Sequence, residues 1–173
     1  ESGAVTVKES SCPVVLMQLK AKIQGNPFVV VDQYQSDVRA YHPEYERIES
    51  PFTGQDTLAL PPIDLDYALV HANKADSKGN LHIEPPIASD VILARNADRV
   101  IATVEETIHN QEMRDIRVSI PYFEVDKVVR RPYGAHPTSC YPQYTYDRSH
   151  LDRFKKMTAN SEGGVQKYLE HYV

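Results

Sequence analysis

Apolar residues recur at helical spacing near the start of the chain and then gather in short runs between turns. Within residues 14–23 they fall one, three and four positions apart, which predicts a helix that ends at Gly25. The β-branched run at 28–31 predicts a buried strand. Residues 33–58 are polar, aromatic and rich in breakers, so we expect a long irregular excursion there.

Short apolar strands alternate with helices along the rest of the chain. The expected elements are strands at 67–72, 99–104 and 125–129, a turn at 76–80, an extended segment at 81–83, and helices at 90–96 and 148–172, the last interrupted at 163–164. This alternation predicts an α/β layer structure with a largely parallel sheet. In such sheets, ligands bind at the carboxyl ends of the strands.

Composition narrows the class of protein. The 173 residues, 41% hydrophobic and 25% charged, suit one globular domain or most of one. The apolar runs are far shorter than the roughly 20 residues that cross a bilayer, so we expect no membrane segment. The net charge of −5 argues against nonspecific nucleic-acid binding. Residues 1–4 include neither an initiator methionine nor signal-peptide features, so we expect a processed, cleaved or truncated chain.

Cysteine and histidine positions indicate neither a disulfide framework nor a metal centre. Cys12 and Cys140 lie far apart without a paired spacing, which favours a reducing, cytoplasmic setting. The histidines lack ligand spacing, so the sequence predicts no metal. His71 and His82 fall on expected strands, where satisfied core or interface histidines are typical.

Three motifs in order carry a resemblance to a known family. They are DYALVHANKADSKGN at 66–80, VIATVEETI at 100–108 and VDKVVRRPYGAHPTS at 125–139, and GNPF at 25–28 with PFTGQ at 51–55 extends the match. Together they resemble the alpha subunit of family I coenzyme A transferases, in the glutaconate and 3-oxoacid CoA-transferase branch that includes CoA-hydrolase-like members. Residues 1–173 then correspond to the C-terminal part of one alpha-subunit domain.

The resemblance implies a fold and a set of partners. It implies a three-layer α/β sandwich with a mainly parallel sheet, of the NagB/RpiA/CoA-transferase-like type. About ninety further residues, including a Gly-rich loop, would precede this part of the domain. The partners implied are a beta subunit, that N-terminal part if it has been cleaved, and an acyl-CoA. Coenzyme A would be a substrate, and no resident cofactor is expected.

The resemblance also implies covalent chemistry on another chain. In family I transferases a beta-subunit glutamate attacks the acyl-CoA thioester and passes through an anhydride and a glutamyl-CoA thioester. The nucleophile therefore lies outside this sequence. The active site should lie between subunits.

Glu9 is the catalytic candidate in this chain. It stands sixteen residues before Gly25 and opens the segment Glu9-Ser10-Ser11, which is similar to an E-x-S segment of the family. In ring-opening CoA hydrolases of the branch, that glutamate faces the acyl group and can act as a general base. Alternatively, the negative charge of Glu9 interacts favourably with the dipole of the following helix, and Ser10 or Ser11 caps that helix. Both interpretations stay open.

Three further residues are candidates for substrate binding. Glu105 and Glu106 end a strand, but adjacent residues of a strand face opposite ways, so at most one of them, Glu105, lines the site. A salt bridge or a helix start is the structural alternative. His136 could orient a substrate carboxylate or shape its loop, and Ser139 follows in the same motif.

Two classes of function remain. The chain is a subunit of a heteromeric enzyme that transfers CoA between carboxylic acids, or a relative that hydrolyses a carboxylated acyl-CoA or one of its C–C bonds. Alternatively it is a non-catalytic structural or regulatory subunit, because similar folds serve sugar-phosphate isomerases and sugar-sensing regulators. The AHPTS loop favours the enzyme.

Overall fold

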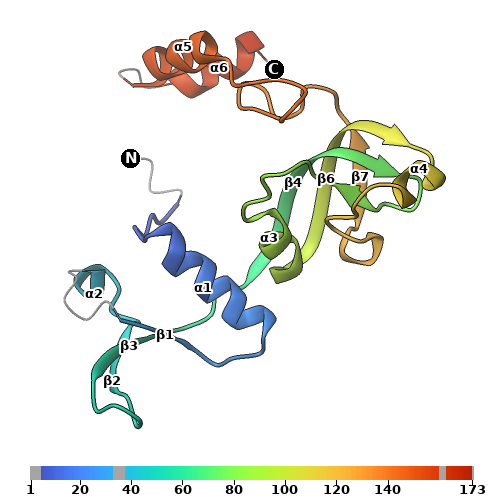
Figure 1. Cartoon of the computed structure of the whole chain (residues 1–173). Helices are drawn as coiled ribbons and strands as arrows, with labels where there is room; N and C mark the ends of the chain where they lie inside the picture. Colours follow the sequence, from blue (N-terminus) through green and yellow to red (C-terminus); the bar gives the residue numbers. More distant parts are fainter. Residues whose placement is uncertain (1–4, 33–37, 160–162, 173) are drawn as a thin grey trace. The chain divides into compact units, whose positions relative to one another are not determined.

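The computed structural model describes residues 5–32, 38–159 and 163–172, and the chain divides into two compact units. The first comprises Glu1–Ala68 and Ala88–Val100, and the second comprises Leu69–Ile87 and Ile101–Val173. Two long strands, β4 (Leu65–Asp76) and β6 (Ala97–Ile108), run from the first unit into the second (Figure 1).

The first unit combines helices with a small antiparallel sheet. The order of its strands is β1 (Val29–Val31), β3 (Asp56–Leu60) and β2 (Glu46–Glu49). Its helices are α1 (Cys12–Ile23), α2 (Val38–Tyr41) and α3 (Asp90–Asn96). Strand β3 pairs on both sides: its Leu58 lies opposite Val31 of β1 and opposite Arg47 of β2. The central strand therefore contributes its side chains to the core.

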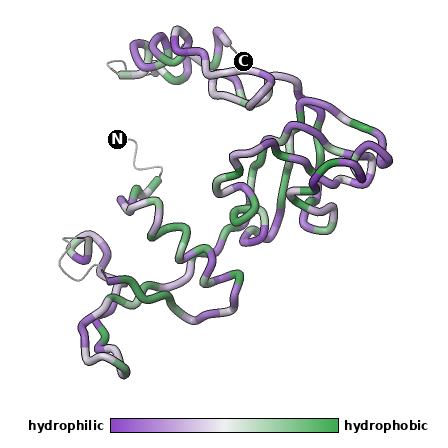
Figure 2. The backbone as a smooth tube through the Cα atoms, viewed as in Figure 1, coloured by the Kyte–Doolittle hydropathy of each residue, from purple (hydrophilic) through white to green (hydrophobic). Residues whose placement is uncertain are grey.

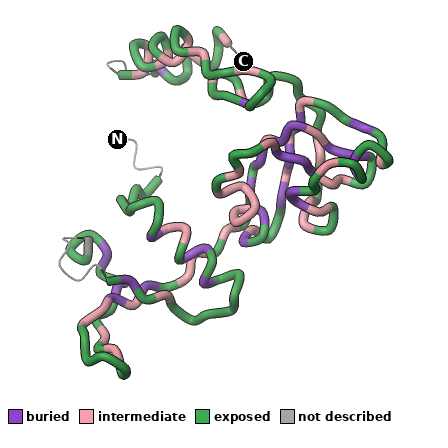
Figure 3. Tube along the Cα trace, viewed as in Figure 1, coloured by how far each residue is buried: buried purple, intermediate pink, exposed green. Residues whose placement is uncertain are grey.

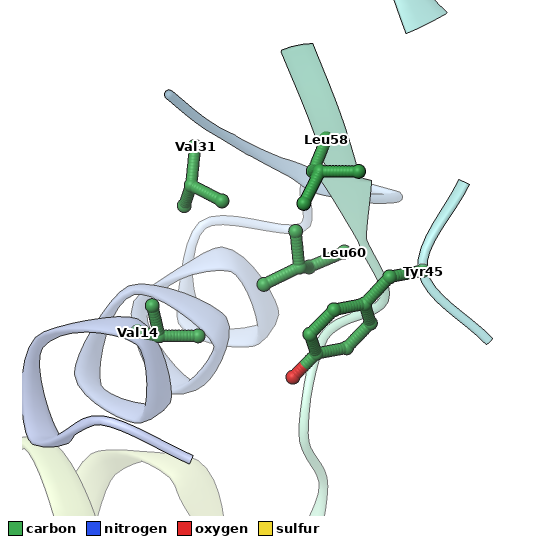
Figure 4. Close-up of a cluster of buried hydrophobic side chains, with 5 residues drawn as sticks. All are labelled: Val14, Val31, Tyr45, Leu58 and Leu60. Atoms are coloured by element: carbon green, nitrogen blue, oxygen red, sulfur yellow. The ribbon is translucent and has the colours of Figure 1, made fainter. Parts of the chain in front are cut away.

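Helix α1 packs against strands β1 and β3 of this sheet. Val14, Val31, Tyr45, Leu58 and Leu60 form one buried cluster, in which Val14 comes from α1 and the two leucines from β3 (Figure 4). Both leucines are almost completely inaccessible to solvent, which is where the largest hydrophobic stabilisation is gained. This cluster holds α1 against the sheet.

A buried amide joins the two longer helices of this unit. Asn96, the last residue of α3, donates from Nδ2 to the backbone oxygens of Leu19 at 3.0 Å and of Ile63 at 2.9 Å. Gln18 of α1 donates similarly to the backbone oxygen of Pro61 at 2.8 Å. These bonds satisfy backbone groups that would otherwise be buried without partners.

The second unit is built on a four-stranded mixed sheet. Its strand order is β5 (Leu81–His82), β4, β6 and β7 (Lys127–Arg130), with β4 and β5 antiparallel and β6 and β7 parallel. Two short helical segments, α4 (Asn110–Arg114) and η1 (Tyr122–Glu124), connect β6 to β7. Buried residues concentrate on β4 and β6 (Figure 3), so the central strands form the core of the sheet.

Two helices follow β7 after a loop at residues 131–147. They are α5 (Arg148–Thr158) and α6 (Gly164–Tyr172), and their aromatic rings pack on each other, with Phe154 and Tyr168 centroids 4.8 Å apart. Helix α5, which is described throughout, has no buried residue, and both helices are largely hydrophilic (Figure 2). Among the described residues, no helix has both the length and the apolar character that crossing a membrane requires.

The predicted α/β class is confirmed, together with most of its elements. Helix α3 has the predicted bounds of 90–96, and strands lie at or near 28–31, 67–72, 99–104 and 125–129. The strand near 28–31 belongs to the separate antiparallel sheet rather than to the sheet that contains the parallel pair.

The prediction of a long irregular segment at 33–58 is wrong for its second half, from residue 46 onward. Strands β2 and β3 form a hairpin there, closed by backbone bonds between Ser50 and Gln55 and between Gly54 and Ser50. Strand β2, an edge strand of mostly exposed polar residues, has no apolar run that could signal it. Residues 33–37 lie outside the described part of the chain.

Candidate functional site

The carboxylate of Glu105, on β6 of the second unit, is the centre of a hydrogen-bonded site. Its side chain is only 9% exposed. Oε1 accepts from the Tyr144 hydroxyl at 2.6 Å and lies 2.7 Å from His71 Nε2. Oε2 accepts from the Tyr133 backbone N–H at 2.8 Å. One strand residue thus joins β4 to the loop at 131–147.

The three donors decide the charge of this carboxylate. Burial alone would raise the pKa of Glu105, but the bonds from Tyr144, Tyr133 and His71 together outweigh it and lower the pKa. Burial, and then the hydrogen bond to Glu105, raise the pKa of the Tyr144 phenol. The site therefore holds a carboxylate anion beside a neutral phenol at neutral pH.

Alternation along β6 selects which of two adjacent glutamates faces inward. Glu105 points into the site, whereas Glu106 is exposed. The two adjacent side chains thus differ in exposure, as strand alternation predicts, and the role of Glu105 in substrate binding stays a prediction. The remaining strand contact comes from Thr103, whose hydroxyl lies 2.8 Å from His71 Nδ1. His71 is a satisfied, half-buried strand histidine, as its position in the sequence suggested.

The loop at 131–147 closes tightly over this strand pair. Tyr133 has a φ of 58°, in the left-handed region that residues other than glycine rarely adopt. Its ring stacks on that of Tyr144 with 5.0 Å between centroids, and the Ala135 N–H donates to the Tyr144 hydroxyl at 3.0 Å. The strained residue is held by its bond to Glu105.

Gly134 is the point where the loop comes nearest to β4. A Cβ atom added there would lie 2.8 Å from the Arg131 backbone oxygen and 2.9 Å from His71 Cε1. We expect Gly134→Ala to lower the free energy of unfolding by about 2 kcal/mol, because the loop must shift to relieve the overlap. Urea unfolding measures it. Ser139→Ala, at an exposed position of the same loop, is the control and should change the free energy of unfolding little. A substitution at Gly25 would not serve as a control, because its φ of +67° makes any side chain there strained.

Asn73, a buried residue of β4, holds the far side of the loop. Its Nδ2 donates to the Tyr141 backbone oxygen at 2.6 Å and to Gln143 Oε1 at 2.7 Å, and its Oδ1 accepts from the Glu84 N–H at 2.8 Å. Sequence reasoning missed both Asn73 and Tyr144. The one signal available for Asn73 was a polar amide directly after the apolar run at 67–72.

Cys140 lies beside this amide and is buried, whereas Cys12 is exposed. Burial, followed by the negative charge of Glu105, raises the pKa of the Cys140 thiol to about 11. Thiolate is the reactive form, so we expect a soluble alkylating reagent at pH 8 to modify Cys12 rapidly and Cys140 only after unfolding. Peptide mass spectrometry before and after denaturant distinguishes the two, and equal early labelling would contradict the described burial.

His136 and Ser139 lie in the same loop but outside the contacts of Glu105 described above. His136 is exposed, and its Nε2 lies 3.3 Å from Asp147 Oδ2. Ser139 is also exposed. The structure therefore brings Glu105 together with the loop backbone, while His136 pairs with Asp147, the N-cap residue of α5.

Glu9 lies in the first unit, in an exposed segment that precedes α1. Its backbone oxygen is bonded by Nε2 of the buried His42, and the neighbouring Lys8 pairs with Glu44 at 2.9 Å. Lys8, and then the Glu44 N–H and His42, lower the pKa of Glu44 to about 2. The main chain at Glu9 is thus held while its side chain is exposed to solvent.

The structural alternative for this segment is only partly supported. Ser11 occupies the N-cap position of α1, but among the described residues its side chain makes no capping bond. Pro13 takes one of the first helical positions instead, where its missing N–H costs nothing. Helix capping by Ser11 therefore does not account for the polar Glu9-Ser10-Ser11 segment.

Within the described part of the chain, two groups of side chains bring possible metal-ligand atoms within 4.8 Å of one another. They are His71, Glu105 and Cys140, and His136, Asp147 and His150. In the first group both ring nitrogens of His71 have partners and the Cys140 thiol is neutral, so the geometry is that of a completed hydrogen-bond network.

The sequence is similar to a known protein family and to several characterised proteins. The sequence profile of the coenzyme A transferase family matches residues 29–131. The A subunit of glutaconate CoA-transferase from Acidaminococcus fermentans is 32% identical over 94% of this chain and 57% of its own length. The cholesterol ring-cleaving hydrolase IpdA subunit of Mycobacterium tuberculosis is 28% identical over 99% of this chain and 63% of its own length.

Solved structures show the same likeness. The crystal structure of glutaconate coenzyme A-transferase from A. fermentans matches 99% of this chain and 60% of that chain, with a TM-score of 0.89 and 29% identity. A variant of the decarboxylase AibA/AibB matches 98% of this chain and 62% of that chain, with a TM-score of 0.83 and 35% identity. The predicted transferase-like α/β fold is confirmed, and the chain spans about three fifths of these relatives' lengths.

Proposed function

Since the chain belongs to the coenzyme A transferase family, we propose that it forms part of the alpha side of a heteromeric enzyme that moves coenzyme A between carboxylic acids. The observation that carries the proposal is the match to glutaconate CoA-transferase, which extends over 99% of this chain in structure at a TM-score of 0.89. The predicted PYGAHPTS motif at 132–139 lies within the loop that Glu105 anchors.

The proposed reaction needs a partner chain. A glutamate of a beta-type subunit would attack the acyl-CoA thioester and form an acyl-glutamyl anhydride as the coenzyme A thiolate leaves. The thiolate would then attack the glutamyl carbonyl, which releases the first carboxylate and leaves a glutamyl-CoA thioester. The second carboxylate would attack this thioester, and the same two steps in reverse would give the new acyl-CoA and free the glutamate. Coenzyme A is a substrate here, and no resident cofactor is required. We place the enzyme in the cytoplasm, where the two free cysteines would remain reduced.

This chain would contribute groups that hold the acyl portion. Glu9, exposed in front of α1 with its main chain held by His42, would act on the acyl group as a base or as an electrostatic partner. The Glu105 carboxylate would act through the loop, because it holds the Tyr133 and Tyr144 ends of that loop together. Ser139 would offer its exposed hydroxyl to substrate.

A hydrolytic reaction is the second candidate. The relative named a cholesterol ring-cleaving hydrolase subunit is 28% identical over 99% of this chain, close to the value for the transferase. If the partner lacks the glutamate nucleophile, Glu9 becomes the leading base for activating water or for cleaving a C–C bond. The matched decarboxylase structure supports a fold that serves reactions other than CoA transfer.

Turnover in a complete complex tests the proposal. The chain is coexpressed with the preceding alpha-subunit residues and a beta-type subunit, and acyl-CoA consumption is followed with and without an acceptor carboxylate. Transfer predicts turnover that requires the acceptor, whereas hydrolysis predicts turnover without it. A complex of the correct mass that turns over neither way would support a structural or regulatory role.

A further inference from the structure

Two histidines and one aspartate meet where the loop at 131–147 joins α5. His136 Nε2 lies 3.3 Å from Asp147 Oδ2, and the rings of His136 and His150 lie 5.0 Å apart at 83°. One ligand atom from each of the three lies within 4.8 Å of the others. We propose that these residues bind one divalent transition-metal ion, and Zn²⁺ in particular, as a clip between the loop and α5.

The two oxygens of Asp147 have separate tasks. Oδ1 accepts from the His150 N–H at 2.9 Å and from the Ser149 hydroxyl at 2.7 Å, which caps the start of α5. Oδ2 faces His136. Oδ2 is therefore available to a cation without loss of the helix cap.

The ring of His150 is oriented by the neighbouring helix. Its Nε2 lies 2.7 Å from the hydroxyl of Tyr168 on α6, and the two rings meet edge to face with centroids 5.6 Å apart. An Nε2–H that donates to this hydroxyl leaves Nδ1 unprotonated and able to bind a metal. Metal-binding histidines commonly use their second nitrogen in this way, because the bond fixes both tautomer and orientation.

The set of donors suits zinc and similar ions. Two imidazoles and a carboxylate supply three ligands, and water can complete a four-coordinate site. His136 and Asp147 are each about 40% exposed, so an ion can enter from solvent. Binding replaces the proton shared between His136 Nε2 and Asp147 Oδ2, and that proton either moves to His136 Nδ1 or leaves to solvent.

The cluster differs from the one around Glu105 in what its atoms already do. There, both His71 nitrogens and both Glu105 oxygens have partners within 2.8 Å. At Asp147, the only contact of Oδ2 among the bonds described is with His136, at a longer 3.3 Å. A metal ion bound by both atoms would replace this hydrogen bond with two metal–ligand bonds, and the N···O separation of 3.3 Å already suits a tetrahedral ion. The sequence-based prediction of no metal site differs from this proposal because the ligands lie eleven and three residues apart and meet only in the fold.

The ligand role replaces the substrate-carboxylate role that the sequence suggested for His136. A bound ion would tie the loop anchored by Glu105 to the α5–α6 pair through His150 and Tyr168. The site would be structural, and it does not depend on which acyl-CoA reaction the family member performs.

Zinc titration of the full chain tests the proposal directly. Isothermal titration calorimetry with ZnCl₂ is run on tag-free protein carrying Cys12→Ser, which removes the exposed thiol as a competing ligand. We expect one ion per chain, an affinity loss of about a hundredfold or more for His136→Ala and His150→Ala, and a loss of about 10–100-fold for Tyr168→Phe. His171→Ala on α6 is the matched control and should bind like the parent.

Asp147→Asn keeps the proposal testable if the histidine variants unfold. Asparagine retains the oxygen that caps α5 and removes the charge, so the metal-free circular dichroism should be preserved while zinc affinity falls. Co²⁺ absorption provides a second readout of the same ligands. The proposal is overturned if the parent binds no ion, or if Asp147→Asn binds zinc as tightly as the parent and the His171→Ala control do.

Discussion

Replacing Glu9 with glutamine is expected to slow turnover of the reconstituted enzyme by about a hundredfold or more if Glu9 is the general base. Glutamine keeps the size and hydrogen-bonding shape of the side chain but cannot accept a proton. Acyl-CoA affinity should change little, because the basicity is needed only in the transition state. The backbone bond from His42 to Glu9 is unaffected by the substitution.

Steady-state kinetics measure the loss of turnover, and equilibrium binding measures the acyl-CoA affinity of the same variant. Ser10→Ala, next to Glu9 in the same exposed segment, is the matched control and should retain turnover. Loss of affinity without loss of kcat would assign Glu9 to binding alone. Unchanged turnover in a complete complex would return Glu9 to a residue that only precedes a helix.

Glu105→Gln is expected to lower the free energy of unfolding by about 3 kcal/mol, because a buried carboxylate with three donors is replaced by a group that carries donors of its own. The amide nitrogen must face the Tyr133 N–H, or else His71 and the Tyr144 hydroxyl. The loop at 131–147 should then detach, and hydrogen exchange of its amides should rise.

The same variant has a defined pH dependence. The folded pKa of Glu105 is lowered below the ordinary value of 4.5. Its contribution to stability is therefore fully present above that value and is lost as pH falls through the folded pKa. Glu105→Gln should flatten the acid side of the stability curve. Urea unfolding from pH 3 to 7 measures it.

Glu106→Gln is the control for this experiment, because Glu106 carries the same charge as Glu105 and lies next to it on β6 but is exposed. Its effect should stay within about 0.5 kcal/mol at every pH. Equal losses for both variants would mean that charge on β6, and not the bonded site, determines the stability.

Local patterns predicted the elements whose side chains are buried. The helix at 90–96 and the strands of the main sheet have apolar runs bounded by turns, and they appear at those places. The hairpin of β2 and β3 was missed because Glu46, Arg47 and Glu49 are exposed on an edge strand, where pairing depends on the backbone and on the neighbouring β3. Polar sequence alone does not distinguish such a strand from a loop.

The candidate site was predictable at one residue and not at its partners. The position of Glu105 near the end of a strand run indicated it, and strand alternation separated it from Glu106. Tyr144 and His71 lie 39 and 34 residues away from Glu105, and Asn73 contacts a residue 70 positions away. Contacts at such separations arise only from the packing of the loop on the sheet.

Photo-crosslinking in the active complex tests the central claim, that this chain lines the acyl site of an acyl-CoA enzyme. An acyl-CoA with a photoreactive group in its acyl chain is bound to the turnover-competent complex, irradiated, and mapped by peptide mass spectrometry. We predict adducts on the segment around Glu9 or on the loop at 131–147, competed away by unlabelled acyl-CoA. Adducts confined to the partner chain, in a complex that still turns over, would contradict the claim.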